Sequence, residues 1–277
     1  MKWEDLRRSQ NVEDRRGRSP RMGGPAGIGI GAVILALLGG LLFGVSPSDI
    51  LAQLQGGTFT TAPAPQSPSA NDRDSQFVRS IVGDLEDIWG QMIQGYRPPQ
   101  LVLFDGQVES ACGFADAAVG PFYCPRDAKV YLDTSFFDQL ERLTRGQASD
   151  FAKAYVIAHE VGHHIQNLLG ISDKVRAQQA RSSQTVANQL SVHLELQADC
   201  LAGVWGHYAQ RRGLLEFGDV EGAIAAASAI GDDNLQRRSQ GYVVPDAFTH
   251  GSSEQRVGWF NRGFQTGDPN RCDTFRN

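Results

Sequence analysis

A run of 20 residues without a polar side chain limits how the rest of this chain can be organised. Residues 26–45 are all Ala, Gly, Val, Ile, Leu or Phe, and no charged residue lies between Met22 and Ser48. A helix of this length spans roughly 30 Å, which matches the hydrocarbon core of a bilayer. The run is too long for the apolar part of a cleaved signal peptide, and no small-residue cleavage site follows Val45. We therefore predict one transmembrane helix, a signal anchor, over residues 26–45.

The charges around this run predict its orientation. Residues 1–25 hold seven Lys and Arg against four Asp and Glu, and such positive flanks stay in the cytoplasm. The prediction is a basic cytoplasmic tail over residues 1–25, a single pass through the inner (plasma) membrane, and a periplasmic or other extracytoplasmic location for everything after Val45. Two GxxxG spacings within the run are compatible with a weak homodimer through the anchor. The net charge of −5 argues against a nucleic-acid partner.

Composition divides the remainder of the chain into a linker and one domain. Residues 46–73 are rich in Pro, Ser and Thr, which is typical of an extended tether. From Asp74 onward, apolar residues such as Phe77, Val78 and Ile81 recur at helical spacing. No second linker follows, so residues 74–277 are predicted to form one domain of about 200 residues.

Four cysteines follow the apolar run: Cys112, Cys124, Cys200 and Cys272. An even number of cysteines outside the cytoplasm indicates two disulfides. We favour Cys112 with Cys124, which closes a short glycine-containing loop, and Cys200 with Cys272, which ties the C-terminus to a helix. A structural metal site built from the four thiolates is the alternative, but none of the spacings is the C-x2-C that is common in such sites.

The residues best suited to catalysis lie in one pentapeptide, His159-Glu160-Val161-Gly162-His163. It falls within residues 149–169, which are predicted to form an amphipathic helix. Two histidines four residues apart project from one face of a helix, so both imidazoles can reach a single zinc ion. Glu160 then lies beside the metal and is predicted to act as general base on a water that the metal activates. One Zn²⁺ per chain is the predicted cofactor.

A second predicted helix, residues 184–211, offers the missing ligand. A catalytic zinc takes three protein ligands and leaves one position open. Glu195 and Asp199 lie one turn apart on one face of this helix. We predict Glu195 as the third ligand and Asp199 as the acceptor of the N–H of a ligating imidazole, a contact that fixes the orientation of the ring. Without the pentapeptide, a carboxylate pair at this spacing would more often be a solvated helix face.

The motif HEVGH followed by ELQAD resembles the gluzincin metallopeptidases, in which a second helix supplies a Glu ligand and an Asp four residues later. The longer strings SACGFADAAVGPFYCP, VYLD, AHEVGHHIQ, ELQADCLAGVW and FTHGSSEQRVGWF resemble the bacterial putative neutral zinc metallopeptidase family over most of residues 74–265. The resemblance implies a zinc-dependent hydrolase. The predicted fold class is mainly α, of an α+β zincin-like kind: a helical metallopeptidase domain with a small β-sheet, preceded by one transmembrane helix.

Two further segments gain a role from this chemistry. A late Thr-His followed by Arg resembles membrane-associated gluzincins, which implies that His250 and Arg256 line the active site as candidates to stabilise an oxyanion. The alternatives are a loop histidine before a helix capped by Ser252 or Ser253, and an arginine in a surface salt bridge. Residues 129–133 are predicted to form a strand, either an edge strand that binds an extended peptide or an ordinary core strand.

The sequence thus predicts a membrane-anchored zinc metallopeptidase that acts on peptide or protein substrates. A zinc-binding but catalytically idle module that captures peptides at the membrane surface is the alternative, and a purely structural domain without metal is a third. Glu160 favours the enzyme, because metal binding alone does not require a carboxylate at that position. His164, His193 and His207 lie outside the ligand pattern and are predicted to be structural or surface residues.

Overall fold

The structure is a computed structural model that describes residues 1–17 and 72–276. Within these ranges it contains eight α-helices and six strands, which confirms a mainly α fold with a small amount of sheet. Among the helices of these residues, none is long and apolar enough to cross a membrane. The helix predicted over residues 26–45, the homodimer predicted through it and most of the predicted linker lie outside the described residues.

Four strands form a mixed sheet in the order β1-β2-β6-β5. These are β1 (Val12–Asp14), β2 (Gln100–Phe104), β6 (Lys129–Asp133) and β5 (Phe122–Cys124). The first three run parallel, and β5 lies antiparallel to β6 at one edge. A separate hairpin of β3 (Gln107–Ser110) and β4 (Gly113–Asp116) precedes β5. Residues 129–133 are thus an inner strand, so the core-strand alternative is right and the edge-strand hypothesis is wrong for this segment.

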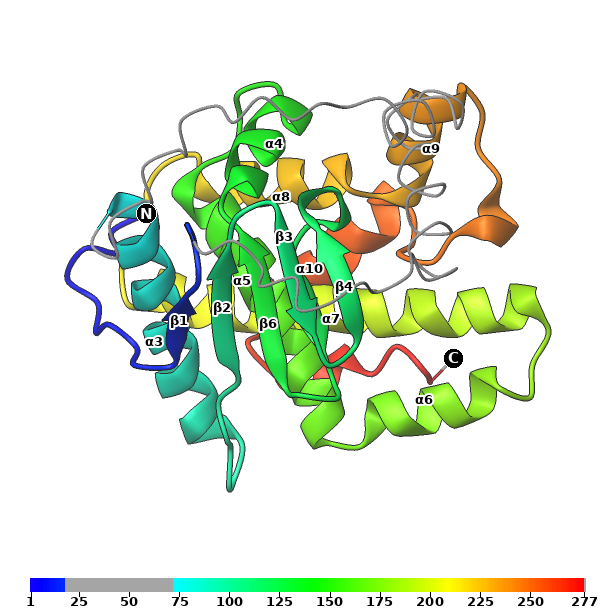
Figure 1. Ribbon diagram of the computed structural model, residues 1–277, viewed down its shortest axis with the longest axis horizontal. Coiled ribbons are helices and arrows are strands. Elements are labelled where there is room, and N and C mark those ends of the chain that lie inside the picture. The colour runs from blue at the N-terminus through cyan, green and yellow to red at the C-terminus, as the bar shows by residue number, and fades with distance from the viewer. Residues whose placement is uncertain (18–71, 277) are drawn as a thin grey trace, which may run out of the picture.

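The helices pack around α5 (Asp150–Leu168), most of which is buried. The others are α3 (Arg73–Met92), α4 (Ser135–Leu143), α6 (Ile171–Gln179), α7 (Gln184–Arg211), α8 (Asp219–Ala229), α9 (Asp232–Gln240) and α10 (Ser253–Thr266). In Figure 1 the sheet lies in front of α5, and the long helix α7 crosses behind it; α3, α7, α8, β5 and β6 all contact α5. Side chains carried by α5 are therefore held in place from several directions.

Side-chain caps set the ends of the helices that carry the predicted site. The Ser149 hydroxyl accepts a hydrogen bond from the backbone N–H of Ala152 at the start of α5, and Ser183 caps α7 in the same way. Ser252 forms a capping box with Gln255 at the start of α10, which confirms one of the two expected caps. The predicted helices over residues 149–169 and 184–211 are both present.

A glycine allows α5 and α7 to approach closely. A Cβ added at Gly162 would lie 3.0 Å from the Cα of Ala198, which is tighter than nine in ten real Cβ contacts. Gly162 belongs to the pentapeptide, and Ala198 lies one turn beyond Glu195. The close approach of the two helices therefore places the two parts of the predicted metal site opposite each other.

Both predicted disulfides are present. Cys112–Cys124 ties the β3–β4 hairpin to β5, and Cys200–Cys272 ties α7 to the turn near the C-terminus. All four cysteines are used in these two bonds, so the alternative of a four-thiolate metal site is not compatible with the pairing.

Residues 1–17 belong to the folded domain, which corrects the prediction of a separate tail over residues 1–25. Trp3 is buried; its indole N–H donates to Asp150 at the start of α5 over 3.0 Å, and its ring packs edge-on against Phe77. Val12 is buried in β1, which hydrogen-bonds to β2. The domain consequently comprises residues 1–17 together with the chain from residue 72 onward, and not residues 74–277 alone.

The positive charge of this segment does not make it a free tail, because several of its arginines are ion-paired within the domain. Arg16 contacts Asp14 at 2.7 Å and Asp72 at 2.8 Å, and Arg7 contacts Glu86 at 2.8 Å. One membrane crossing between residues 17 and 72 would leave its two flanks in different compartments, which does not fit this packing. The single-pass topology with a cytoplasmic N-terminus therefore conflicts with the position of residues 1–17, while the compartment that holds the domain stays a prediction.

Candidate metal centre and active site

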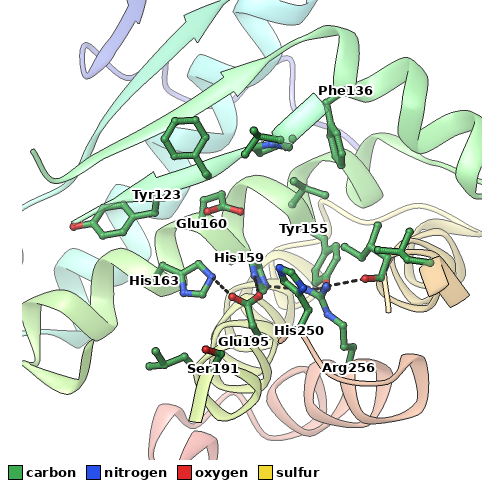
Figure 2. Close-up of a pocket in the computed structure, with 18 of the residues that line it drawn as sticks. Tyr123, Phe136, Tyr155, His159, Glu160, His163, Ser191, Glu195, His250 and Arg256 are labelled. Atoms are coloured by element: carbon green, nitrogen blue, oxygen red, sulfur yellow. Dashed lines mark hydrogen bonds and ion pairs between the residues drawn. The ribbon is translucent and has the colours of Figure 1, made fainter. Parts of the chain in front are cut away.

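The three predicted metal ligands converge where α5 meets α7 (Figure 2). Nε2 of His159 lies 3.1 Å from one carboxylate oxygen of Glu195, and Nε2 of His163 lies 3.3 Å from the other. Ligand atoms held about 2.1 Å from a tetrahedral zinc ion are roughly 3.4 Å apart, so this donor set fits zinc. Within the described residues, no other group of His, Cys, Asp or Glu side chains is arranged to hold a metal.

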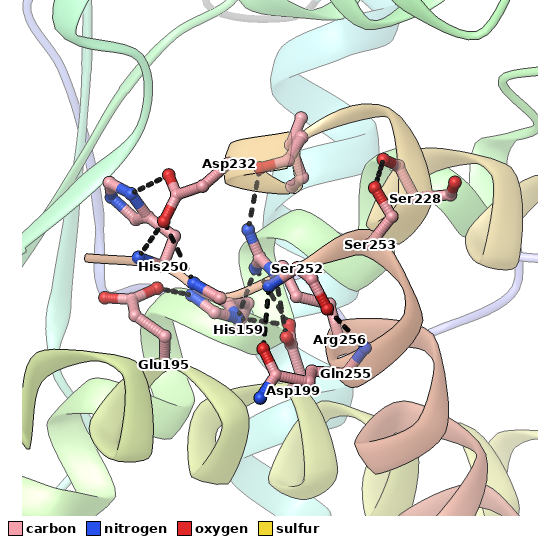
Figure 3. A network of polar contacts seen from close by, with 12 residues as sticks. His159, Glu195, Asp199, Ser228, Asp232, His250, Ser252, Ser253, Gln255 and Arg256 are labelled. Carbon is pink, nitrogen blue, oxygen red and sulfur yellow. Dashed lines mark hydrogen bonds and ion pairs between the residues drawn. The ribbon is translucent and has the colours of Figure 1, made fainter. Parts of the chain in front are cut away.

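Asp199 orients the ring of His159, in the position that the sequence predicted. Its Oδ1 accepts the Nδ1–H of His159 over 2.8 Å, which leaves Nε2 directed at Glu195. The same carboxylate accepts the hydroxyl of Tyr155 over 2.5 Å and the guanidinium of Arg256 (Figure 3). Burial raises the pKa of Asp199, but Arg256 and His159 outweigh this and lower the pKa to about 2. Asp199 is therefore an ionised acceptor at neutral pH, as ring orientation requires.

Arg256 lies behind His159 and is committed to Asp199. Its Nε and Nη2 donate to the two carboxylate oxygens over 2.8 and 2.9 Å, and the residue is only 3% exposed. This bidentate pairing is among the strongest that side chains form. The geometry does not support an oxyanion role for Arg256, nor the alternative of a surface salt bridge. Its contacts make it a positioning residue for Asp199 and, through it, for His159.

His163 is oriented by a residue that the sequence reasoning did not single out. Its Nδ1–H donates to Oε1 of Gln166 over 2.9 Å. The amide of Gln166 is held in turn, because its Nε2 donates to the backbone carbonyl of Leu194 over 2.7 Å. Each histidine ligand thus has its second ring nitrogen engaged by a fixed acceptor, which is the usual arrangement at protein zinc sites.

His250 stands beside this cluster on the loop before α10 (Figures 2 and 3). Its Nδ1 donates to Asp232 over 3.1 Å, and about half of its side chain is exposed. Asp232 also accepts the backbone N–H groups of residues 249–251, which shapes the loop. Burial lowers the pKa of His250. The negative charges of Asp232 and Glu195 raise it by more than this, so the pKa lies above its ordinary value. The placement agrees with the predicted role of His250 as a donor, and it adds Asp232 as the residue that holds the ring.

The carboxylate of Glu160 lies on the cleft side of the ligand cluster (Figure 2). The residue is 7% exposed, and burial raises its pKa even though His163 and His159 oppose the effect. A carboxylate with a raised pKa exchanges protons more effectively near neutral pH. Its position beside the histidine ligands matches the general base that the sequence predicted.

A cleft of about 1050 Å³ opens above the cluster, and the edge strand β5 borders it. Phe122 and Tyr123 of β5 line this cleft together with the loop before them. The sequence does not predict this edge, because the glycines and Cys124 in this segment favour a disulfide-closed loop. The adjacent aromatic residues after Gly120 were the available signal for a strand.

The three remaining histidines are structural, as predicted. His164 is buried; its Nε2 donates to the backbone carbonyl of Arg97 over 2.6 Å, and its Nδ1 accepts the hydroxyl of Tyr123 over 3.0 Å. His207 hydrogen-bonds to the carbonyl of Phe264, and His193 packs against an aromatic ring near the C-terminus. His164 also anchors β5 to α5 through Tyr123, so it helps to set the position of the cleft edge.

Comparison with known proteins agrees with this site. The chain matches the family model described as putative neutral zinc metallopeptidase over residues 1–275. It is 48% identical to the protein YpfJ of Escherichia coli strain K12 over 285 residues, covering 99% of each chain. It is 41% identical to Rv2575 of Mycobacterium tuberculosis strain H37Rv over 252 residues, covering 85% of this chain and 84% of the relative. No solved structure matches the chain. On this similarity, the chain belongs to the putative neutral zinc metallopeptidase family.

Proposed function

We propose that this protein is a zinc-dependent peptidase whose reaction takes place in the cleft between β5 and α7. The observation that carries the proposal is the convergence of His159, His163 and Glu195 at one point, with the carboxylate of Glu160 beside it. Two imidazoles and one carboxylate leave a fourth coordination position for water or substrate. When bound, zinc would supply Lewis acidity, both to the attacking water and to the scissile carbonyl group.

The residues around the metal each have a separate role in the reaction. Glu160 accepts the proton of the attacking water and returns it to the leaving nitrogen. His250, held by Asp232, donates a hydrogen bond to the oxygen on which negative charge develops. Asp199 keeps His159 in the orientation that ligation needs.

Strand β5 is suited to hold a peptide substrate. It pairs with β6 along one side only, and its residues line the cleft. An extended peptide can add to such a free edge through main-chain hydrogen bonds. This feature favours peptide or protein substrates over small molecules without an extended backbone.

The domain is proposed to act outside the cytoplasm. Its two disulfides support this location, because disulfides persist in oxidising compartments. Residues 1–17 share the compartment of the catalytic residues, since they pack into the same folded unit.

The proposal is tested by incubating the purified full-length chain with a diverse peptide library and identifying products by mass spectrometry, before and after metal removal with a chelator. We expect cuts that disappear on chelation and return with one equivalent of zinc. Retention of library peptides without any cut would instead favour the catalytically idle binding module. Cuts that persist undiminished after chelation would contradict the zinc mechanism.

A further inference from the structure

The charged side chains on the walls of the cleft are of one sign. Apart from Glu160 and Glu195 at the metal centre, no Asp or Glu of the described residues lines the cleft. Four arginines line it: Arg256, which is paired with Asp199, and Arg142, Arg176 and Arg238. The chain as a whole carries a net charge of −5, so the cleft walls differ in sign from the protein average. A concave surface lined by one sign of charge raises the local concentration of oppositely charged ligands.

Two of these arginines line the cleft where the end of α4 and the end of α9 are joined. Arg142 lies in the last turn of α4, and Arg238 lies in the last turn of α9. Nη2 of Arg238 donates to the backbone carbonyl of Leu143 over 3.1 Å, which fastens the end of α9 to the end of α4. Within the described part of the chain, neither guanidinium forms an ion pair with a carboxylate. Arg176 lies elsewhere along the cleft and is paired with Asp173 at 3.2 Å, so its charge is partly compensated.

Arg142 and Arg238 are both exposed residues that line the cleft, so a ligand in the cleft can reach them. Leu143, next to Arg142 in α4, and Leu235, one turn before Arg238 in α9, line the cleft as well. A concave surface with two uncompensated positive charges attracts an anion more strongly than a flat surface with the same charges, because the low-dielectric walls focus the field.

The direction of β5 indicates which part of a substrate reaches this end. Before β5, the chain passes α4, where a Cβ added at Gly120 would contact the ring of Phe136 at 3.6 Å. Within β5, Tyr123 hydrogen-bonds to His164 and Asn167 near the end of α5. β5 thus runs away from α4, and a peptide paired antiparallel to it runs toward α4. Substrate residues on the C-terminal side of the scissile bond then approach Arg142 and Arg238.

We propose that Arg142 and Arg238 form a subsite that binds a carboxylate on the C-terminal side of the scissile bond. The inference rests on the proposed peptidase function and names its substrate class. Guanidinium groups match carboxylates in both charge and hydrogen-bond geometry. The carboxylate can come from an Asp or Glu side chain within a longer peptide, or from the free C-terminus of a short one.

The test uses one cleavable sequence from the library in matched fluorogenic peptides. In the first series, amidated peptides carry Glu, Gln or Lys at the second and third positions after the scissile bond. In the second series, a neutral peptide ends at the same distance from the scissile bond, once as the amide and once with a free C-terminal carboxylate. For the full-length wild-type protein we expect a kcat/KM at least about tenfold higher for a carboxylate-bearing peptide than for the Lys peptide. An advantage of the Glu peptide assigns the subsite to acidic side chains, and an advantage of the free C-terminus assigns it to the terminal carboxylate.

Charge reversal separates the subsite from a general effect on folding. The double variant Arg142→Glu/Arg238→Glu should prefer the Lys peptide, a gain that a misfolded protein cannot show. The control is Arg237→Glu, the same charge reversal at a residue of α9 that does not line the cleft. This variant should keep the wild-type substrate preference. Equal rates for all wild-type peptides, or an unchanged preference in the double variant, would overturn the subsite. Failure of the wild type to cut any peptide would overturn the proposed function, and the subsite with it.

Discussion

Replacing Glu160 with Gln is expected to lower kcat/KM by about a thousandfold while zinc binding stays unchanged. The amide keeps the size of the side chain but cannot accept the proton of the attacking water. Zinc should remain, because the metal-binding group consists of His159, His163 and Glu195 and does not include Glu160. Steady-state kinetics on a library-derived peptide and zinc content per chain, measured on the same preparation, check both halves of the prediction.

The matched control for this variant is Glu109→Gln. Glu109 is an exposed residue of β3 and does not line the cleft, so the same chemical change should leave both activity and zinc content as in the wild type. A Glu160→Gln protein that keeps more than a tenth of wild-type activity would rule out Glu160 as the general base. Loss of zinc from this variant would show that Glu160 helps to bind the metal, against the arrangement described here.

The second large effect is expected at Asp199, because its replacement leaves a buried guanidinium without a counter-charge. Asn at this position cannot balance Arg256, and we expect the free energy of unfolding to fall by about 3–5 kcal/mol. His159 also loses the charged acceptor that fixes its ring, so zinc affinity should fall by about 10- to 100-fold. Urea unfolding of the zinc-free protein measures the first effect, and zinc titration of the folded protein measures the second.

The pH dependence of this stability difference tests whether the charge of Asp199 causes it. Burial raises the pKa of Asp199, but Arg256 and His159 lower it to about 2, against an ordinary value of 3.8. A carboxyl group whose pKa is lower in the folded state stabilises the fold above its ordinary pKa, and this contribution is lost as the pH falls toward the folded-state pKa. The stability difference between the wild type and Asp199→Asn should therefore be full above about pH 4 and shrink from there to about pH 2.

A second substitution provides the control for Asp199. Replacing Arg256 with Met in the Asp199→Asn background removes the unpaired buried charge, and it should recover part of the lost stability. Two results would contradict a stabilising ion pair between Asp199 and Arg256. One is an Asp199→Asn protein as stable as the wild type, and the other is a double variant less stable than Asp199→Asn alone.

The metal site could be predicted because its determinants are local in sequence. His159 and His163 share a helix face, and so do Glu195 and Asp199, so helical periodicity alone aligned each pair. The structure adds what periodicity cannot give, the close approach of the two helices at Gly162. Asp232 and Gln166 were missed because their roles depend on tertiary contacts, and nothing in their own sequence neighbourhood marks them as partners of His250 and His163.

The largest error concerned residues 1–17, and its cause was physical. A count of charges treats every arginine as solvated, whereas Arg16 is buried between two carboxylates. Trp3 and Val12 offered a signal for a buried segment, but their partners lie more than 70 residues away in sequence, which no local pattern can identify. Strand β5 was missed for a related reason, since a strand of three residues is too short to show alternation.

The most direct test of this account is the zinc K-edge X-ray absorption spectrum of the full-length chain loaded with one equivalent of zinc. We expect nitrogen and oxygen ligands at about 2.0–2.1 Å, outer-shell scattering from two imidazoles and no sulfur ligand. A sulfur shell at about 2.3 Å would place the metal on cysteines, and so contradict both the metal centre of His159, His163 and Glu195 and the disulfide pairing. A protein that binds no zinc would contradict the account altogether.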